Sequence, residues 1–567
     1  MSRPILLLAA LACLAAPLAA QDQRPYDLII TGGQLLDGTG NPAVPGEVAI
    51  RDGRIAAVGR LPHRNAKHVI LARGKVVAPG FIDIHSHADD GAGPRGGFRD
   101  PDPKRKAALN IVTQGVTTVV VNQDGRSPWP VRDQRDQLRR DGIGPNAILL
   151  AGHGTIRGRV MGTDFRRPAT PDEVARMRAL LREALADGAW GLSAGLEYVP
   201  GRWSTTDEVA ALVEEIVPSG GVYISHERSE GRDPMWYWPS QDPAGPPTLL
   251  DAVKETIEIG ERTGARVVAS HLKAKGATYW GSSKAAIELI ARARARGVDV
   301  WADQYPYTTS GTDGNTVLIP GWALGRGPDQ LGAAPAQSNQ RPDYSAALRQ
   351  TLADAALAAK AREDVAHEII RRGGAEKVLV QQHPDTAMQG KTLAEIAARL
   401  GVPAVEAAFE IQFRGNPQRM GGGRLRGFSL DEVDLDLIAA QPWVATASDG
   451  GIGLPEDGPA THARFYGTFP RKIRRYAIER GVLRVEDAVR SMTTLPAQIL
   501  GLADRGGLRE GMWADVVVFD LGVIRDRATF TDPHQYAEGV EWVLVNGEAV
   551  VEAGKPTGKL AGKVLIR

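Results

Sequence analysis

The chain has 567 residues, enough for about two to four domains, and its 43% hydrophobic content is sufficient for a large buried core. A formal net charge of +1 excludes the strongly basic surface that binding to nucleic acid or to an anionic membrane requires. We therefore expect a globular protein whose partner is a small molecule, and the composition is compatible with a homo-oligomer.

The N-terminus has the features of a secretory signal. Arg3 precedes an apolar run over residues 5–16, and small residues follow before the expected cleavage after residue 20. Because the run is too short to span a bilayer comfortably, it disfavours a membrane anchor, and no later segment has the composition of a membrane span. We predict a signal peptide over residues 1–20 and export to the periplasm or beyond the cell.

Cys13 is the only cysteine in the sequence, and it lies within this predicted signal. The exported chain would therefore contain no disulfide and no thiolate ligand for a metal. Lipidation of Cys13 stays open as an alternative, although residues 10–12 match a lipoprotein signal poorly.

The two ends of the exported chain have the pattern of short β-strands. Near the start, the Asp52–Gly53 pair stands between apolar runs, and near the end the Asn546–Gly547 pair does the same. Both dipeptides are strong signals for a hairpin turn. We predict that the ends meet in one small β-sandwich made of residues 21–77 and 501–567, with the middle of the chain inserted between them.

The middle of the chain alternates short buried strands with helical stretches, which is typical of a parallel sheet covered by helices. Eight strands are predicted, at Lys75–His87, Thr117–Asp124, Ala147–His153, Trp190–Leu196, Gly221–His226, Arg266–His271, Val298–Tyr305 and Trp443–Asp449. Their simplest closure is one α/β barrel of the (β/α)8 type over residues 78–500. The connection between the last two strands is too long for a loop and predicts an inserted subdomain over about residues 310–440.

Most of these strands end on a polar side chain, and (β/α)8 barrels build their active sites at the carboxyl ends of their strands. The first strand ends with His85 and His87, whose spacing of two places both imidazoles on one face. The fifth and sixth strands end with His226 and His271, and the eighth ends with Asp449. Each residue alone is more often structural, but together, at equivalent strand ends, they predict a site for a divalent metal.

The remaining histidines lack this context. His153 ends the third strand, where a place in the site and a structural hydrogen bond both stay open. Surface or loop roles are expected for His63, His68, His367, His383, His462 and His534.

Several long motifs indicate a known family. They are APGFIDIHSHADD (78–90), QGVTTVVVNQDG (114–125), GHGTIRGRVMG (152–162), GLSAGLEYVPG (191–201), ISHERSE (224–230), ASHLKAKG (269–276), DQYPYTTSGT (303–312), ASDGG (447–451), HARFYGTFPR (462–471) and TTLPAQILGLADRGGLREGMWADVVVFD (493–520). On these motifs the chain resembles the amidohydrolase superfamily, specifically its D-aminoacylase (N-acyl-D-amino-acid deacylase) branch, over nearly the whole exported chain.

The resemblance implies roles for individual residues. Asp449 matches the aspartate that acts as general base and then as general acid. The positions that match the family's metal site are His85, His87, His226, His271 and Asp449. The positions that match those holding the carboxylate of an N-acyl amino acid are Lys273, Tyr305 and Arg464.

The sequence departs from the family pattern at Asp124, where that pattern has a cysteine after the second strand. Aspartate can bind zinc through oxygen, so we expect a divalent metal, with zinc first and one or two ions. Glu197, just after the fourth strand, is a second candidate for the missing ligand, since other amidohydrolases place a bridging group there. A salt bridge within its loop is the alternative for Glu197.

A second departure is the aromatic stretch Asp233–Pro239. Clustered aromatic side chains predict either a wall over the acyl pocket or a packed loop that covers the rim of the barrel.

These observations predict an exported metal-dependent amidohydrolase that cleaves N-acyl (D-)amino acids or similar small carboxylated amides with metal-activated water. One alternative is an amidohydrolase for cyclic amides or dipeptides. Another is an inactive metal-binding or ligand-binding homologue, which Asp124 favours and the retained Asp449 disfavours. A serine hydrolase is disfavoured, because Gly191–Gly195 fits the Gly-x-Ser-x-Gly pattern but a loop follows where that motif requires a helix.

Overall fold

The structure is a computed structural model that describes residues 24–89, 97–311, 314–326 and 342–567. The predicted signal peptide over residues 1–20, with Cys13, lies outside the described residues. None of the helices in the described ranges combines the length and the apolar character that crossing a membrane would need.

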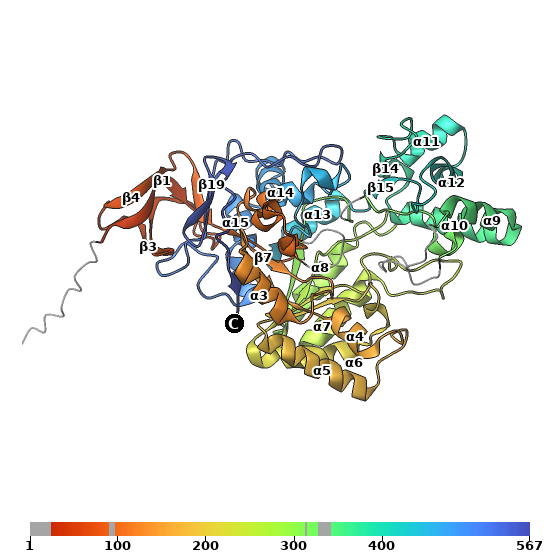
Figure 1. The fold of residues 1–567 in the computed structure, drawn as a ribbon, viewed down its shortest axis with the longest axis horizontal. Coiled ribbons are helices and arrows are strands. Elements are labelled where there is room, and N and C mark those ends of the chain that lie inside the picture. The colour runs from red at the N-terminus through yellow and green to blue at the C-terminus, as the bar shows by residue number, and fades with distance from the viewer. Residues whose placement is uncertain (1–23, 90–96, 312–313, 327–341) are drawn as a thin grey trace, which may run out of the picture.

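Both ends of the chain contribute strands to one sheet, which lies at one end of the molecule and is called the end sheet below (Figure 1). Strand β17 pairs antiparallel with β5 and so joins the C-terminal strands to the N-terminal ones. The two ends of the chain therefore meet in one sheet. The strands of the end sheet are β1 (Tyr26–Leu35), β2 (Val44–Arg51), β3 (Arg54–Gly59), β4 (Ala66–Leu71), β5 (Val76–Pro79), β17 (Val516–Phe519), β18 (Val540–Val545), β19 (Glu548–Glu552) and β20 (Lys555–Pro556).

The two predicted hairpin turns occur in this sheet. Asp52 and Gly53 connect β2 to β3, and Asn546 and Gly547 connect β18 to β19. All four residues have a positive φ. This is the backbone conformation that a tight turn between twisted strands requires, and it explains why Asp-Gly and Asn-Gly pairs stand at these positions.

The predicted strands of the middle segment are all present, and they form two parallel sheets. One sheet contains β6 (Phe81–Asp83), β7 (Val116–Val121) and β8 (Asn146–Leu149). The other contains β9 (Ala151–Gly152), β10 (Gly191–Gly195), β11 (Val222–His226), β12 (Arg266–Ala269), β13 (Val300–Gln304) and β16 (Val444–Thr446). A single residue separates β8 from β9, and a parallel bridge between Ser86 and Gly450 links the far edges of the two sheets.

Three segments differ from the prediction. The expected strand Ala147–His153 is divided into β8 and β9, which belong to different sheets, and His153 is the first residue of helix α4 (His153–Met161). The expected strand Lys75–His87 is divided at Gly80, so that β5 belongs to the end sheet and β6 to the parallel strands. A Cβ at Gly80 would lie 2.3 Å from the side chain of Thr117, so the chain can pass between the two sheets only because this residue has no side chain. The C-terminal strand β21 (Val564–Leu565) pairs with β8 and not with the end sheet.

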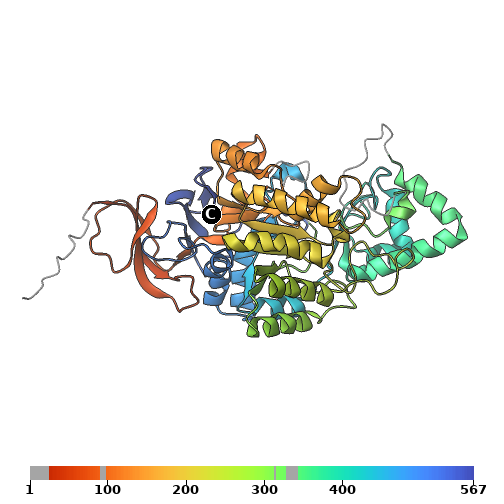
Figure 2. The same ribbon diagram turned by 90° about the horizontal axis from the view of Figure 1, so that it is seen from below.

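Helices lie along the outside of the parallel strands (Figure 2). Several begin at a side-chain cap: Thr170 and Glu173 form a reciprocal capping box at the start of α5, and Thr248 and Asp251 do so at α7. The helices are α1 (Pro103–Ala107), α2 (Leu109–Val112), α3 (Val131–Asp141), α4 (His153–Met161), α5 (Pro171–Ala186), α6 (Thr206–Val213), α7 (Leu249–Thr263), α8 (Ser283–Ala295), α14 (Arg464–Arg471), the π-helix η7 (Lys472–Glu479), α15 (Val485–Ser491) and α16 (Thr494–Leu500).

The long connection between β13 and β16 folds around a core of its own, at the opposite end of the molecule from the end sheet (Figure 1). Leu348, Val365, Ile396 and Phe409 belong to this core. Its elements are α9 (Tyr344–Ala353), α10 (Ala355–Arg371), β14 (Val378–Gln382), α11 (Leu393–Leu400), α12 (Ala404–Arg414) and β15 (Arg424–Gly427). Helix α13 (Glu432–Ala439) follows this core and packs against α8.

Lys472, at the start of η7, is a buried cation outside the metal centre described below. Burial lowers the pKa of Lys472 to about 7, and Asp436 only partly offsets this effect. The folded protein therefore holds this ammonium group at a cost in stability that the unfolded chain does not have.

Replacing Lys472 with methionine is expected to stabilise the protein by roughly 2–4 kcal/mol at about pH 6 and by much less at about pH 10. Between the folded pKa and the ordinary lysine value, the unfolded chain binds more protons than the folded protein, so the stability of the parent rises with pH across that window. Urea unfolding of parent and variant at both pH values measures the difference. The exposed Lys284→Met is the control, and an equal gain at both pH values would contradict the assignment.

Candidate metal centre

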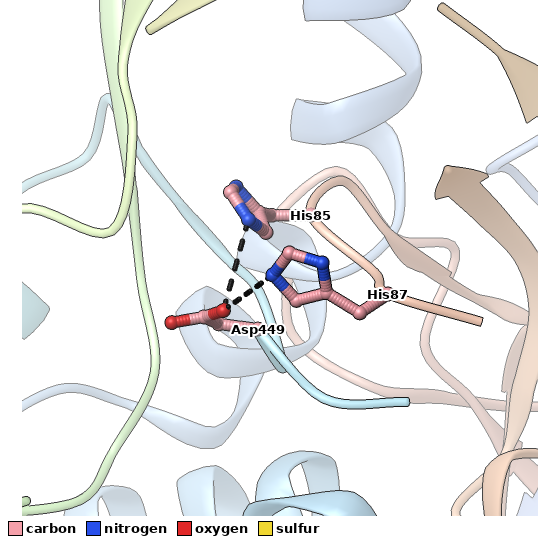
Figure 3. A group of neighbouring side chains, drawn as sticks. All are labelled: His85, His87 and Asp449. Atoms are coloured by element: carbon pink, nitrogen blue, oxygen red, sulfur yellow. Dashed lines mark hydrogen bonds and ion pairs between the residues drawn. The ribbon is translucent and has the colours of Figure 1, made fainter. Parts of the chain in front are cut away.

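The residues predicted as metal ligands converge at the carboxyl ends of the parallel strands. His85, His87 and Asp449 form one group whose ligand atoms lie within 4.8 Å of one another. In Figure 3 both imidazoles point toward the carboxylate of Asp449. His87 Nε2 lies 3.0 Å from Asp449 Oδ1, and His85 Nε2 lies 3.7 Å from the same oxygen.

Asp124 places its carboxylate between this first group and the other two histidines. Asp124 Oδ1 lies 3.5 Å from His85 Nε2 and 3.6 Å from both His226 Nδ1 and His271 Nε2. Asp124 Oδ2 lies 3.5 Å from His87 Nε2. Oδ1 therefore faces three imidazoles and Oδ2 faces the fourth, so that this one carboxylate contacts all four histidines.

The donor set fits a divalent cation. His85 Nε2 and Asp124 Oδ1 are buried and have no hydrogen-bond partner in the described part of the chain. Leaving such atoms unpaired costs about 1–3 kcal/mol each, unless a cation occupies the space that they face. Imidazole nitrogens and carboxylate oxygens are the ligands that zinc and similar first-row metals accept.

Three of these ligands have an unusual backbone. Asp124, His271 and Asp449 all lie in the left-handed region, with φ of 57°, 36° and 48°. Non-glycine residues avoid this region, at a cost of about 1–3 kcal/mol each, and such residues cluster at functional sites. The surrounding structure must therefore hold these three ligands in place.

The charges of the cluster are mutually dependent. Burial lowers the pKa of His226, but Glu230 and Asp124 outweigh it and raise that pKa to about 10. Burial holds the pKa of His85 well below its usual range, so this imidazole is neutral. Burial would raise the pKa of Asp449, but Arg464 and the neighbouring histidines hold it well below its usual range. A cation that binds here displaces the proton of His226, so its binding releases protons.

Glu197, predicted as a bridging ligand or as part of a loop salt bridge, lies behind His226. Its Oε2 is 3.1 Å from His226 Nε2, and its Oε1 accepts a hydrogen bond from the backbone N–H of Met235 at 2.6 Å. The ring of His226 is thereby held with Nδ1 toward Asp124. Glu197 orients a ligand in this structure and is absent from the candidate ligand groups of the described residues.

Of the two roles left open for His153, a place in the site or a structural hydrogen bond, the structure shows the hydrogen bond. Its Nε2 lies 3.0 Å from Glu208 Oε1, and Arg157 forms an ion pair with the other oxygen of the same carboxylate. This buried network connects α4 to α6, away from the candidate metal ligands.

The three residues predicted to hold a substrate carboxylate lie together beside Asp449. Lys273 Nζ and the Arg464 guanidinium lie 5.4 Å and 4.6 Å from the centre of the Tyr305 ring. Arg464 Nη1 is 2.8 Å from Asp449 Oδ2. Burial raises the pKa of Tyr305 to about 12, and its hydroxyl has no hydrogen-bond partner among the described residues. The cluster thus offers N–H and O–H donors to an anion next to the predicted general base.

Sequence reasoning missed several buried residues of the site. Glu230 forms ion pairs with Lys273 and with Lys275, and its Oε1 lies 3.3 Å from His271 Nδ1. The sequence signal for Glu230 was its position four residues after His226 in the ISHERSE motif.

His462, expected in a surface or loop role, is buried and accepts a hydrogen bond from the backbone N–H of Arg464. Asp83 and Asp303 stand inside two of the quoted motifs, but they were missed because nothing in their spacing distinguishes a buried strand carboxylate that supports the site.

The stretch Asp233–Pro239 is a packed loop, as one of its two predicted roles requires. Arg371 of α10 is buried and donates hydrogen bonds to three backbone carbonyls of the loop, at 2.6, 3.1 and 3.1 Å. Trp236 is partly buried, and the Arg202 guanidinium lies 4.4 Å from the centre of its ring. The inserted segment thus fixes the loop that also donates a hydrogen bond to Glu197.

A buried cluster of imidazoles and carboxylates at the ends of parallel strands has the position and the donor atoms of the metal centre of an enzyme. The sequence matches the model of the amidohydrolase family over residues 68–551. It is 33% identical to D-aminoacylase of Alcaligenes xylosoxydans xylosoxydans, covering 97% of this chain and 99% of the relative. It is also 33% identical to N-acyl-D-glutamate deacylase of the same organism, with 96% and 97% covered.

Solved structures give the same result. The structure of N-acyl-D-glutamate deacylase from Bordetella bronchiseptica, complexed with zinc and a phosphonate inhibitor, has a TM-score of 0.72 at 31% identity and covers 96% of this chain and 100% of that one. A D-hydantoinase structure at 15% identity, with a TM-score of 0.54, shares only the fold. The chain belongs to the amidohydrolase family, which confirms the resemblance, and it is a metal-dependent hydrolase of amide bonds.

Replacing Arg464 with methionine is expected to raise the pKa of Asp449, because the guanidinium 2.8 Å away no longer stabilises the carboxylate. If Asp449 acts as the base, the acidic limb of the pH–rate profile moves to higher pH by roughly one to three units. Arg140→Met, at a side chain that is 69% exposed, is the control. An unchanged acidic limb would show that Arg464 does not set the protonation of the base.

Proposed function

We propose that the protein is an exported deacylase that hydrolyses N-acyl-D-amino acids or closely similar small carboxylated amides. The observation that carries the proposal is the position of Asp449. One of its oxygens faces His87 at 3.0 Å, and the other faces Arg464 at 2.8 Å, beside Tyr305 and Lys273. The general base therefore lies between the metal ligands and a group of donors suited to a carboxylate.

We propose further that the parallel strands close into one (β/α)8 barrel over residues 78–500. Support comes from the single residue between β8 and β9 and from the parallel bridge between Ser86 and Gly450. On this view the end sheet is the small β-sandwich of residues 21–77 and 501–567, and the segment of about residues 310–440 is a subdomain inserted into the barrel. Export rests on the sequence of residues 1–20.

The cofactor that we propose is zinc, as one or two ions. The residues that would hold it are His85, His87, Asp124, His226, His271 and Asp449. Support comes from the contacts of Asp124 with all four imidazoles and from the binuclear metal centre of the related D-aminoacylase structure. With Asp124 in place of a thiolate, all donors are nitrogen or oxygen, which also suits harder divalent metals.

When bound, a divalent metal lowers the pKa of water and polarises the amide carbonyl. Asp449 accepts the proton of the attacking water, for which its low pKa keeps it ionised, and then delivers that proton to the leaving nitrogen. Arg464 and the Tyr305 hydroxyl bind and orient the carboxylate of the substrate by charge-assisted hydrogen bonds. Lys273, which forms an ion pair with Glu230 in this structure, would also bind this carboxylate if its ammonium group reoriented toward it.

The direct test combines metal analysis with hydrolysis of N-acetyl-D-leucine, N-acetyl-D-glutamate and their L-enantiomers by the purified protein. We expect bound zinc, release of D-amino acids, loss of activity on chelation and recovery on adding zinc. Hydrolysis of cyclic amides or dipeptides alone would overturn the proposed substrate. A protein that never takes up metal, even after reconstitution, would favour an inactive homologue.

Replacing Asp449 with asparagine is expected to lower kcat by about a thousandfold or more, because the amide cannot accept the proton of water. The variant should keep most of its metal, since the histidines and Asp124 remain. Metal analysis and steady-state kinetics on one preparation measure both quantities. A fully active variant would exclude Asp449 as the base.

A further inference from the structure

Ser270 and Asp303, which lie outside the candidate ligand set, connect two of its histidines. Ser270 follows β12 and directly precedes His271, and Asp303 belongs to β13. Ser270 Oγ lies 2.6 Å from His85 Nδ1 and donates a hydrogen bond to Asp303 Oδ2 at 2.7 Å. Asp303 Oδ1 accepts the backbone N–H of His271 at 2.7 Å. All four side chains are buried, so water does not compete for these contacts.

The direction of each hydrogen bond follows from the number of protons. An ionised carboxylate only accepts, and one oxygen of Asp303 already accepts a backbone N–H. The single hydroxyl proton of Ser270 therefore goes to the other oxygen of Asp303. Ser270 Oγ is then left as the acceptor toward His85, and the proton of the neutral imidazole must be on Nδ1.

This tautomer leaves a lone pair on His85 Nε2, which is the atom that faces the metal centre. His85 Nε2 lies 3.5 Å from Asp124 Oδ1 and 3.7 Å from Asp449 Oδ1. It is buried without a hydrogen-bond partner in the described ranges. The opposite tautomer would point an N–H at this position and would exclude a cation.

We propose that Asp303 and Ser270 are positioning residues that fix His85 in the Nδ1–H tautomer and so keep Nε2 available to a divalent metal. Asp303 also accepts a hydrogen bond from the backbone N–H of His271, and this contact helps to hold the backbone of His271 in its left-handed conformation. The inference rests on the proposed function in one respect, namely that a divalent metal binds at this centre.

The chain contains a matched comparison. Ser225 and His226 end the neighbouring strand β11 in the same order as Ser270 and His271. Ser225 Oγ accepts from the Tyr223 hydroxyl at 3.3 Å and donates to the backbone oxygen of His226 at 3.3 Å, without a contact to an imidazole. The orientation of His226 depends instead on Glu197. Ser225→Ala therefore removes a buried serine hydroxyl beside a metal ligand without touching the contact network of His85.

The first measurement is a zinc titration of the full chain against a competing chromophoric chelator. We expect Ser270→Ala to bind one zinc equivalent about 10- to 100-fold more weakly than the parent, because the tautomer of His85 is no longer fixed. Ser225→Ala should bind zinc like the parent. Burial raises the pKa of Asp303 to about 7, so the titration is done at about pH 8.5, where this carboxylate only accepts.

Asp303→Asn gives the sharper test because it is nearly isosteric. The asparagine oxygen would accept the backbone N–H of His271, and its NH2 group would face Ser270 Oγ. The hydroxyl proton of Ser270 then turns toward His85 Nδ1, which moves the imidazole proton to Nε2. We expect a larger loss of zinc affinity than in Ser270→Ala. Thermal unfolding in chelator identifies a misfolded variant, in which case Ser270→Ala carries the test.

The second measurement reads the tautomer itself and requires no metal. In protein labelled with ¹⁵N-histidine, the two ring nitrogens of His85 are distinguished by chemical shift, with His85→Gln giving the assignment. The proposal predicts a protonated Nδ1 in the parent and in Ser225→Ala, and a protonated Nε2 in Asp303→Asn. A parent with Nε2 protonated, or a Ser270→Ala variant that binds zinc like the parent, would overturn it. A parent that binds no zinc but has Nδ1 protonated would reject the proposed function and leave the tautomer assignment supported.

Discussion

The carboxylate of Asp124 is the contact on which the rest of the site depends. Four imidazoles face its two oxygens at 3.5–3.6 Å, in a region that is almost closed to water. Burying so many polar groups without full hydrogen bonding is unfavourable, and a divalent cation is the species that satisfies nitrogen lone pairs and carboxylate charge together. A metal centre therefore explains the cluster, whereas a purely structural hydrogen-bond network does not.

The fold around the cluster holds several of the metal-ligand candidates in backbone conformations that are unfavourable for non-glycine residues. Three ligands have left-handed backbones, and three of the four imidazoles contact a partner outside the ligand set. Glu197 holds His226, Ser270 holds His85, and Glu230 contacts His271. These partners come from different strands and loops, so the arrangement depends on the parallel strands being brought to one edge. The inserted segment contributes as well, because Arg371 fixes the loop whose backbone binds Glu197.

The sequence predicted this architecture well wherever a pattern reports a local physical requirement. Alternating apolar runs gave the strands, and polar residues at their ends gave the ligands. The passage of the chain at Gly80 was not predictable, because the requirement for glycine comes from Thr117, a residue of the neighbouring strand. The same applies to Asp83 and Asp303. Their role depends on contacts with Ser448 and Ser270, which are distant in sequence and adjacent only in the fold.

Likewise, the sequence could name Glu197 as a carboxylate near the site but not say which side of His226 it occupies. That distinction depends on the direction of a loop, which is fixed by Met235 and Arg371.

The most direct test of a metal centre organised around Asp124 is X-ray diffraction from crystals of the full chain grown with zinc, recorded on both sides of the zinc absorption edge. The account predicts anomalous density beside Asp124, within bonding distance of one of its oxygens and of at least two of the four imidazoles. Density elsewhere, or none beside Asp124 at full zinc loading, would contradict it.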